Sequence, residues 1–268
     1  MIIRPPAVAG SFYPGRRDRL ESEVRSHLPE GLVREPAIGA IVPHAGYVYS
    51  GPVAGSVYAR LRIPSSAIVL CPNHTGLGRP AALDPSDFWR TPLGDVPVDR
   101  ELASAVRSRA PSLEEDAAAH AREHSLEVQL PFLQIARPDI RIVPISVGAH
   151  DLDLCRELGE AVAGAAAAEA ERPLILASSD MNHYESRRIG RAKDDLALAA
   201  IEALDPVRLF TTVFAERVSM CGVLPSTALL FAARELGAIS ARVVARRDSG
   251  DETGDPSSVV GYAGVIVA

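Results

Sequence analysis

Short apolar runs rich in Ile and Val recur along the chain, and Gly, Pro or charged residues bound them. Runs of this length and composition predict β-strands, and their continuous apolar character predicts strands that are covered on both faces. Five such runs lie at residues 37–43, 66–72, 140–148, 173–179 and 259–268. A sixth run, at 241–247, alternates in polarity, so we expect it nearer an edge of the sheet.

Segments with apolar residues three or four positions apart separate these runs and predict helices. They lie at residues 16–28, 98–108, 123–136, 151–169, 191–204, 205–218 and 224–237. Asp205 is expected to cap one helix with Pro206 in its first turn, whereas Pro131 should kink or interrupt another. Residues 76–97 and 247–258, rich in Pro, Gly and Asp, are expected to be irregular. This alternation predicts an α/β fold with a central, mostly parallel or mixed sheet flanked by helices.

Composition and charge narrow the class of protein. The hydrophobic fraction of 47% is typical of a soluble domain, and no long linker divides the sequence, so we expect a single domain over residues 1–268. No uncharged apolar run approaches the roughly 18 residues of a membrane span, and the first residues lack signal-peptide features. We therefore expect a cytoplasmic protein without membrane contact. The net charge of −6 and the dispersed arginine pairs argue against nucleic-acid binding.

The three cysteines form neither an even disulfide framework nor a CxxC pair. Cys71 lies inside an apolar run and is expected in the core, although its C-x-x-H spacing to His74 leaves a ligand role open. Cys221 precedes Gly222 just before a predicted helix, whose N-terminus is expected to lower the thiol pKa toward thiolate. A thiolate there could attack a substrate or bind a metal, although an inert buried thiol is the simpler interpretation of Cys221 alone.

Three of the predicted strands deliver a histidine just past their C-terminal ends. His44 follows the first in "IVPHAG", His74 follows the second in "IVLCPNHTG", and His183 follows the fourth in "LILASSDMNHY", three residues after Asp180. In open α/β sheets, ligands bind beyond this edge, so the three imidazoles can converge there. Such a cluster is typical of a metal site or of a general base beside a metal or nucleophile. Asp180 and His183 could equally form a local hydrogen-bonded pair.

Further candidates flank these histidines. The hydroxyls of Tyr47 and Tyr49 could orient a substrate or a metal ligand. His120 and His124 lie four apart in "HAREHSLEVQLP", where a metal clip is conceivable. The same stretch also predicts a helix start capped by Ser125, with acids favoured by the helix dipole. We expect His120 on the surface and leave His124 open.

Six motifs occur in one order along the chain: "AGSFYP", "PHAGYVYSG", "PNHTG", "EHSLEVQLPFL", "SSDMNHY" and "CGVLP". Over essentially its whole length, the sequence thereby resembles the Memo family, also described as component B of the AmmeMemoRadiSam system. The resemblance implies one α/β domain, similar in fold to class III extradiol ring-cleaving dioxygenases. For prokaryotic members, it also implies a system with a radical-SAM enzyme and a small AMMECR-type protein.

The resemblance also implies a set of site residues. His44 and His74 match the family's two metal-binding histidines, and Cys221 matches its third ligand. Asp180 and His183 match the acid and histidine of the same pocket. His183 stands where the dioxygenases keep a catalytic acid/base histidine.

Two further positions bear on the pocket. His124 matches a polar residue of its wall. Val223 and Leu224 stand where the family often has a polar or basic residue, which leaves the substrate contacts near Cys221 open.

A His-His-Cys set is softer than the two-histidine, one-carboxylate set of non-haem iron oxygenases, and it suits Fe(II), Cu(I) or Zn(II). Our leading hypothesis is a mononuclear redox-active metal, with Fe(II) expected and copper or zinc as alternatives, used in an oxidation or O₂-dependent reaction. Asp180 would tune the metal and His183 would move protons. Two other functions stay open: a non-catalytic regulatory protein that binds metal or a peptide, and a zinc hydrolase. The small-molecule substrate is open in each case.

Overall fold

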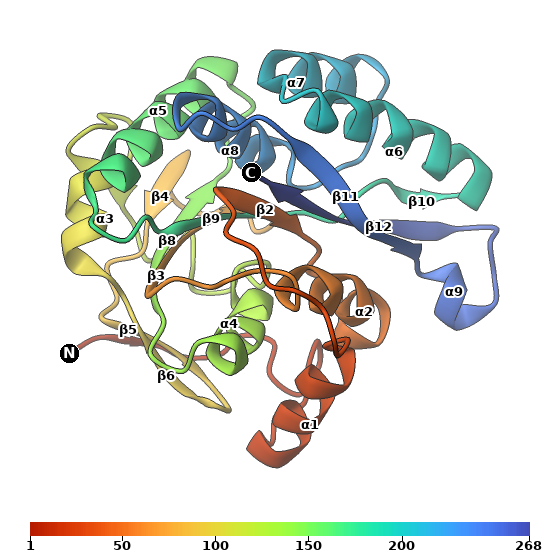
Figure 1. The fold of residues 1–268 in the computed structure, drawn as a ribbon, viewed down its shortest axis with the longest axis horizontal. Coiled ribbons are helices and arrows are strands. Elements are labelled where there is room, and N and C mark those ends of the chain that lie inside the picture. The colour runs from red at the N-terminus through yellow and green to blue at the C-terminus, as the bar shows by residue number, and fades with distance from the viewer.

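Four parallel strands form the middle of the central sheet in the computed structural model, which describes residues 1–268 (Figure 1). In spatial order they are β2 (Gly39–Val42), β9 (Leu174–Ser178), β3 (Ser66–Pro72) and β8 (Arg141–Val147). Every residue of β2, β3 and β9 is buried. The continuous apolar runs therefore form strands covered on both faces, as predicted.

Other strands widen this parallel centre into a mixed nine-stranded sheet. They are β4 (Ala81–Leu83), β7 (Glu114–Glu115), β10 (His183–Glu185), β11 (Ala241–Asp248) and β12 (Val259–Val267). β12 pairs antiparallel with β2, β10 and β11, whereas β11 pairs only with β12. The prediction that 241–247 lies at an edge is confirmed.

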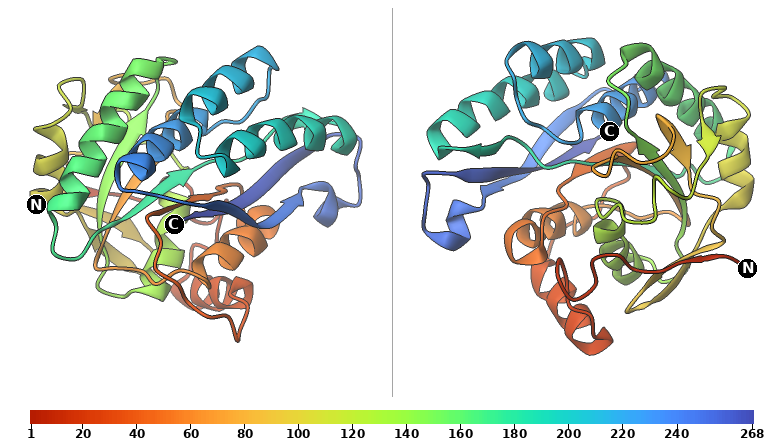
Figure 2. Two further views of the ribbon diagram at one scale, coloured as in Figure 1. Left: turned by 45° about the horizontal axis from the view of Figure 1, so that its top comes forward. Right: turned by 180° about the vertical axis from the view of Figure 1, so that it is seen from behind.

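Helices cover both faces of the sheet (Figures 1 and 2). One face carries α3 (Arg100–Arg107), α5 (Leu152–Ala168), α6 (Arg187–Glu202), α7 (Pro206–Ala215) and α8 (Val223–Glu235), around a core of 44 buried residues. The other face carries α1 (Arg17–His27), α2 (Tyr47–Tyr58) and α4 (Leu130–Ala136), around a core of 27 buried residues. Alternate residues of β3 enter the two cores: Ile68 and Leu70 enter the larger, whereas Val69 and Cys71 enter the smaller. None of these helices combines the length and the apolar character that crossing a membrane requires.

Helix α2 was not predicted, because its sequence carries a proline, Pro52, and has no polar face. The segment expected to be irregular at 76–97 contains β4, β5 (Phe88–Thr91) and β6 (Gly94–Pro97). β5 and β6 form a three-stranded sheet with β1 (Ile3–Arg4). Residues 247–258 likewise include the end of β11 and the short helix α9 (Gly250–Thr253).

The predicted helix at 123–136 begins later than expected. A 3₁₀ turn, η1 (Glu127–Gln129), leads into α4, and residues 123–126 are not helical. Pro131 lies in the first turn of α4, where a missing N–H costs no helical hydrogen bond, so it starts the helix instead of interrupting it. The predicted cap of α7 is confirmed, since Asp205 accepts a hydrogen bond from Arg208 N at 2.9 Å.

Helices α1 and α2 touch at Gly55, and this contact gives a stability prediction. A Cβ at Gly55 would lie 1.9 Å from the backbone oxygen of His27, which no rotamer change can relieve. We expect Gly55→Ala to lower the free energy of unfolding by about 1–3 kcal/mol. Gly164 is the matched control, because a Cβ there meets only the flexible Arg109 side chain at 3.2 Å. Gly164→Ala should be neutral or stabilising, and equal effects of the two changes in urea unfolding would contradict this packing.

Candidate metal centre

The carboxyl ends of β2 and β3 bring two histidines together with a cysteine from the segment before α8. His44 follows β2, His74 follows β3, and one donor atom from each of His44, His74 and Cys221 lies within 4.8 Å of the others. His44 Nε2 is 3.3 Å from Cys221 Sγ. Gly222 allows this approach, because a Cβ there would lie 2.3 Å from the backbone oxygen of Ser178 at the end of β9. Two neutral imidazoles and a thiol at these distances can hold one metal ion.

A cavity of about 590 Å³ opens above these three side chains. Aromatic side chains of Phe12, Tyr49, Tyr184 and Tyr262 line it together with polar groups, and no lysine or arginine does. The wall therefore offers no lysine or arginine side chain to an anionic ligand such as phosphate.

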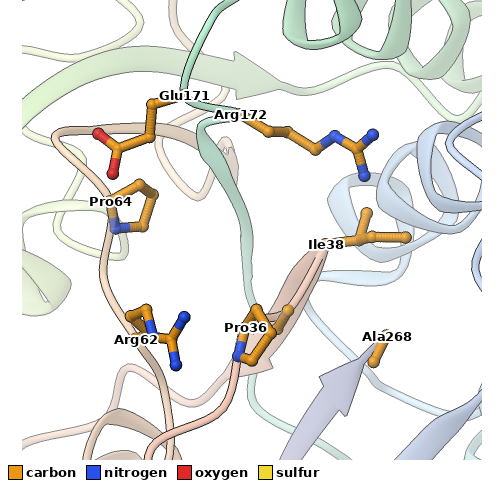
Figure 3. A pocket seen from close by; sticks show the side chains of 8 residues that line it. Pro36, Ile38, Arg62, Pro64, Glu171, Arg172 and Ala268 are labelled. Atoms are coloured by element: carbon orange, nitrogen blue, oxygen red, sulfur yellow. The ribbon is translucent and has the colours of Figure 1, made fainter.

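A smaller cavity of about 330 Å³ lies at the opposite end of the parallel strands (Figure 3). It is lined by Arg62, Arg172 and Glu171 around an apolar floor, and it contains no histidine or cysteine. The Glu171 carboxylate accepts a hydrogen bond from Ser65 N at 2.9 Å. The candidate metal ligands therefore lie at the carboxyl edge of the sheet, and this second cavity offers none.

Burial sets the protonation of the candidate ligands. It lowers the pKa of His44 well below its usual value, and the neighbouring imidazoles of His124 and His74 add to this effect. Burial also raises the pKa of the Cys221 thiol well above its usual value, with a further contribution from Asp180. The expectation that the helix N-terminus lowers the Cys221 pKa is wrong for the protein without a cation, because loss of solvation dominates. Coordination to a divalent metal lowers the pKa of a thiol, so Cys221 would be a thiolate in a metal-bound site.

Asp180 connects two of the candidate ligands through the backbone. Its carboxylate accepts a hydrogen bond from His44 N at 2.7 Å, and its own N–H donates to Cys221 Sγ at 3.2 Å. Asp180 lines the cavity but is not among the donor atoms that lie mutually within 4.8 Å. Burial raises the pKa of this carboxyl group, and the hydrogen bond from His44 opposes the rise.

His183 lines the same cavity from β10. Its Nδ1 lies 2.8 Å from the carbonyl oxygen of Ser219, and its backbone N donates to Ser219 Oγ at 2.7 Å. Because a carbonyl only accepts hydrogen bonds, Nδ1 carries the proton of the neutral ring and Nε2 is left free to accept one. Asp180 and His183 bond to different partners, so the local pair considered from the sequence does not form.

The other candidates divide between the cavity and the core. Tyr49 and His124 line the cavity, and the His124 ring lies 4.7 Å from that of His74. Tyr47 does not line it: its side chain is buried in the core, and its hydroxyl donates to the carbonyl of Val128 at 2.7 Å. The assignment of Tyr47 to the pocket is therefore wrong.

The surface position expected for His120 is also wrong. The residue is fully buried, its ring lies 5.8 Å from that of Trp89, and its Nε2 donates to the carbonyl of Ala82 at 3.0 Å. It does not line the cavity, and its ring nitrogens are not among the donor atoms that lie mutually within 4.8 Å. The conceivable clip between His120 and His124 is therefore absent.

Two polar side chains behind the imidazoles, Glu123 and Ser178, were not predicted from the sequence. Glu123 is fully buried, and its carboxylate accepts hydrogen bonds from His74 N at 2.6 Å and His74 Nδ1 at 2.9 Å. Burial alone would raise its pKa, but hydrogen bonds from His74 and Ser125 lower it to about 2. Ser178 Oγ lies 2.9 Å from His44 Nδ1. A serine directly at the end of an apolar strand, and an acid beside a pocket histidine, were the available signals.

The N-terminal segment closes one side of the cavity. The buried carboxylate of Glu127 pairs with Arg4 and accepts hydrogen bonds from Ala7 N at 2.7 Å and Val8 N at 3.0 Å. The Phe12 ring then lies 4.7 Å from that of His124. One buried acid thus holds the segment that supplies part of the cavity wall.

Comparison with known proteins identifies the family. The sequence model of the Memo family, described as "Memo-like protein", matches residues 4–266. The chain belongs to the Memo family. A MEMO1 family protein of Pyrobaculum arsenaticum is 41% identical over 99% of both chains. Memo relatives from Methanosarcina barkeri and Aquifex aeolicus are 42% and 40% identical, each covering 99% of this chain.

A solved structure supports the fold of this Memo protein. The crystal structure of an uncharacterized Escherichia coli K12 protein superposes with a TM-score of 0.53 and covers 78% of this chain and 89% of its own. The two sequences are 17% identical, so the likeness concerns the fold alone.

The Glu127 anchor gives a prediction of its own. Glu127→Gln keeps the size of the side chain but leaves the buried Arg4 charge unpaired, so the free energy of unfolding should fall by about 3–5 kcal/mol. The control is Glu21→Gln, because Glu21 pairs with Arg25 on the exposed surface of α1 at 2.9 Å. That change should cost less than about 1 kcal/mol. Similar losses for both variants in denaturant unfolding would show that the anchor adds no stability.

Proposed function

We propose that this Memo-family protein binds one redox-active metal ion, iron before copper, and uses it in an oxidation or O₂-dependent reaction of a small organic substrate. The observation that carries the proposal is the convergence of His44, His74 and Cys221 at the base of a cavity. Their donor atoms lie within 4.8 Å of one another, and the space above them measures about 590 Å³.

The chemistry of the donors fits such an ion. Two imidazoles and a thiolate form a softer set than carboxylates do, which favours Fe(II), Cu(I) or Zn(II) over Mg²⁺ or Ca²⁺. Three protein donors leave coordination positions free, whereas structural metal sites use four protein ligands. The adjoining cavity gives those free positions room for a substrate. These features favour a reactive site over a closed one.

The surrounding residues divide the remaining tasks. The free Nε2 of His183 can take a proton from a substrate in the cavity or return one to it. Asp180 fixes the positions of His44 and Cys221 relative to each other, because its carboxylate accepts from His44 N and its own N–H donates to Cys221 Sγ. When bound there, iron or copper would supply electron transfer and O₂ chemistry. The proposal keeps the likeness to class III extradiol dioxygenases that the sequence motifs suggest.

The proposal predicts one metal ion per chain in anaerobically reconstituted protein, measured by metal analysis and electron paramagnetic resonance. His44→Ala and Cys221→Ser should each lose more affinity than the roughly 10–100-fold that removal of an outer partner costs, because each removes a donor atom. Cys155→Ala is the control, since this buried thiol lies in α5, outside the cavity.

The outcomes separate the three candidate functions. A resonance that changes on exposure to O₂ supports the redox proposal. A bound metal that responds neither to O₂ nor to reductant favours the regulatory binding protein, and bound zinc with oxygen-insensitive activity favours hydrolysis. Failure to take up iron or copper, or unchanged binding in His44→Ala, would contradict the proposed site.

A further inference from the structure

Residues 123–129, "EHSLEVQ", run behind the two imidazoles without supplying any of the three converging donor atoms. Glu123, Ser125 and Gln129 are almost completely buried, with exposed fractions of 0%, 0% and 1%. We propose that this segment fixes the ring orientation and the tautomer of His44 and His74 before any metal binds. The inference rests on the proposed metal site and assigns its positioning residues.

The proton of Ser178 decides the tautomer of His44. Ser178 Oγ lies 2.7 Å from the carbonyl oxygen of Ser125, which can only accept, so the hydroxyl proton is committed there. Toward His44 Nδ1, at 2.9 Å, the same oxygen acts as acceptor. Nδ1 therefore carries the ring proton, and the bare Nε2 is the nitrogen that lies 3.3 Å from Cys221 Sγ. In the opposite arrangement the buried Ser125 carbonyl would lose this donor, at a cost in free energy.

Gln129 removes the remaining freedom of Ser178. Its Nε2 lies 3.0 Å from the carbonyl oxygen of Pro43 and 2.9 Å from Ser178 Oγ, so this atom is the amide nitrogen and donates both protons. The Tyr58 hydroxyl donates to Gln129 Oε1 at 3.0 Å and fixes the amide in that orientation. One lone pair of Ser178 is thus occupied by Gln129, and the other receives the proton of His44.

His74 is fixed by a charged partner. Its Nδ1 lies 2.9 Å from Glu123 Oε1, and a carboxylate only accepts, so Nδ1 is protonated and Nε2 is bare. Ser125 holds this carboxylate through its backbone N at 2.9 Å and its hydroxyl at 2.7 Å. Ser125 therefore orients the partners of both imidazoles, Glu123 through its donors and Ser178 through its carbonyl.

The two partners have different effects on a metal. A carboxylate behind an imidazole makes it a stronger donor, whereas a neutral hydroxyl mainly fixes the ring. Glu123 is therefore the residue that sets the donor strength of His74, and Ser178 the residue that sets the tautomer of His44. Both rings present a bare Nε2, so metal binding requires no proton to move between ring nitrogens.

The tautomers can be read in metal-free protein by long-range ¹H–¹⁵N correlation spectra in mildly alkaline, reducing buffer. We expect protonated Nδ1 on both His44 and His74. Ser178→Ala should give His44 a mixture of tautomers and leave His74 unchanged, and Ser178→Thr should restore the single tautomer. A protonated Nε2 on either ring of the unaltered protein would overturn the inference without recourse to any variant.

Metal affinity supplies the second readout, with Co(II) and Zn(II) as probes in competition titrations. Ser178→Ala and Glu123→Gln should each weaken binding about 10–100-fold. The matched control is Ser146→Ala, because Ser146 is a buried serine on β8 whose Oγ has no hydrogen-bond partner. Unchanged affinity in both variants would overturn the inference. The expected tautomers in a protein that binds no iron or copper would support the inference and overturn the proposed function.

Discussion

β2, β9 and β3 run side by side in the same direction, so the residues that follow all three strands emerge at one edge of the sheet. The convergence of His44, His74 and Ser178 depends on this alignment. His44 and His74 follow two of the strands directly, and Ser178 ends the third. Because these strands are buried on both faces, their ends are held rigidly, and a site built on them needs only the segment around Cys221 to close it. The rigidity comes from the core, and the chemistry comes from the side chains at its edge.

Burying so many polar groups at one edge is costly unless each finds a partner. The segment 123–129 meets that requirement with side chains that point to both sides. Glu123 and Gln129 face the imidazoles and their neighbours, whereas Glu127 faces the N-terminal segment. The same short stretch therefore positions the candidate ligands and holds the Phe12 wall of the cavity. Residues 123–126 are not helical: Ser125 N donates to the Glu123 carboxylate, and the Ser125 carbonyl accepts from Ser178 on β9.

The periodicity of apolar residues was enough to predict the parallel centre, the edge position of β11 and most helices, because these features follow from burial. Strand ends also indicated where His44, His74 and His183 would lie. Helix α2 was missed since it is apolar on all sides, and packing against α1 and the sheet stabilises it despite Pro52. That omission explains the error at Tyr47: two positions on a helix differ by more than half a turn, so Tyr49 faces the cavity and Tyr47 the core. Glu123 meets His74 across 49 positions in the chain, and no local pattern encodes such a pairing.

The wide separation of His44, His74 and Cys221 along the chain has a thermodynamic consequence. An unfolded chain holds these groups far apart on average, so only the folded protein offers all three at once. A ligand that binds only the folded state raises the free energy of unfolding by mass action. The increase grows with the logarithm of the ratio of the free ligand concentration to the dissociation constant. At the proposed metal site, a higher free concentration of the ion would therefore raise the free energy of unfolding through the same three side chains.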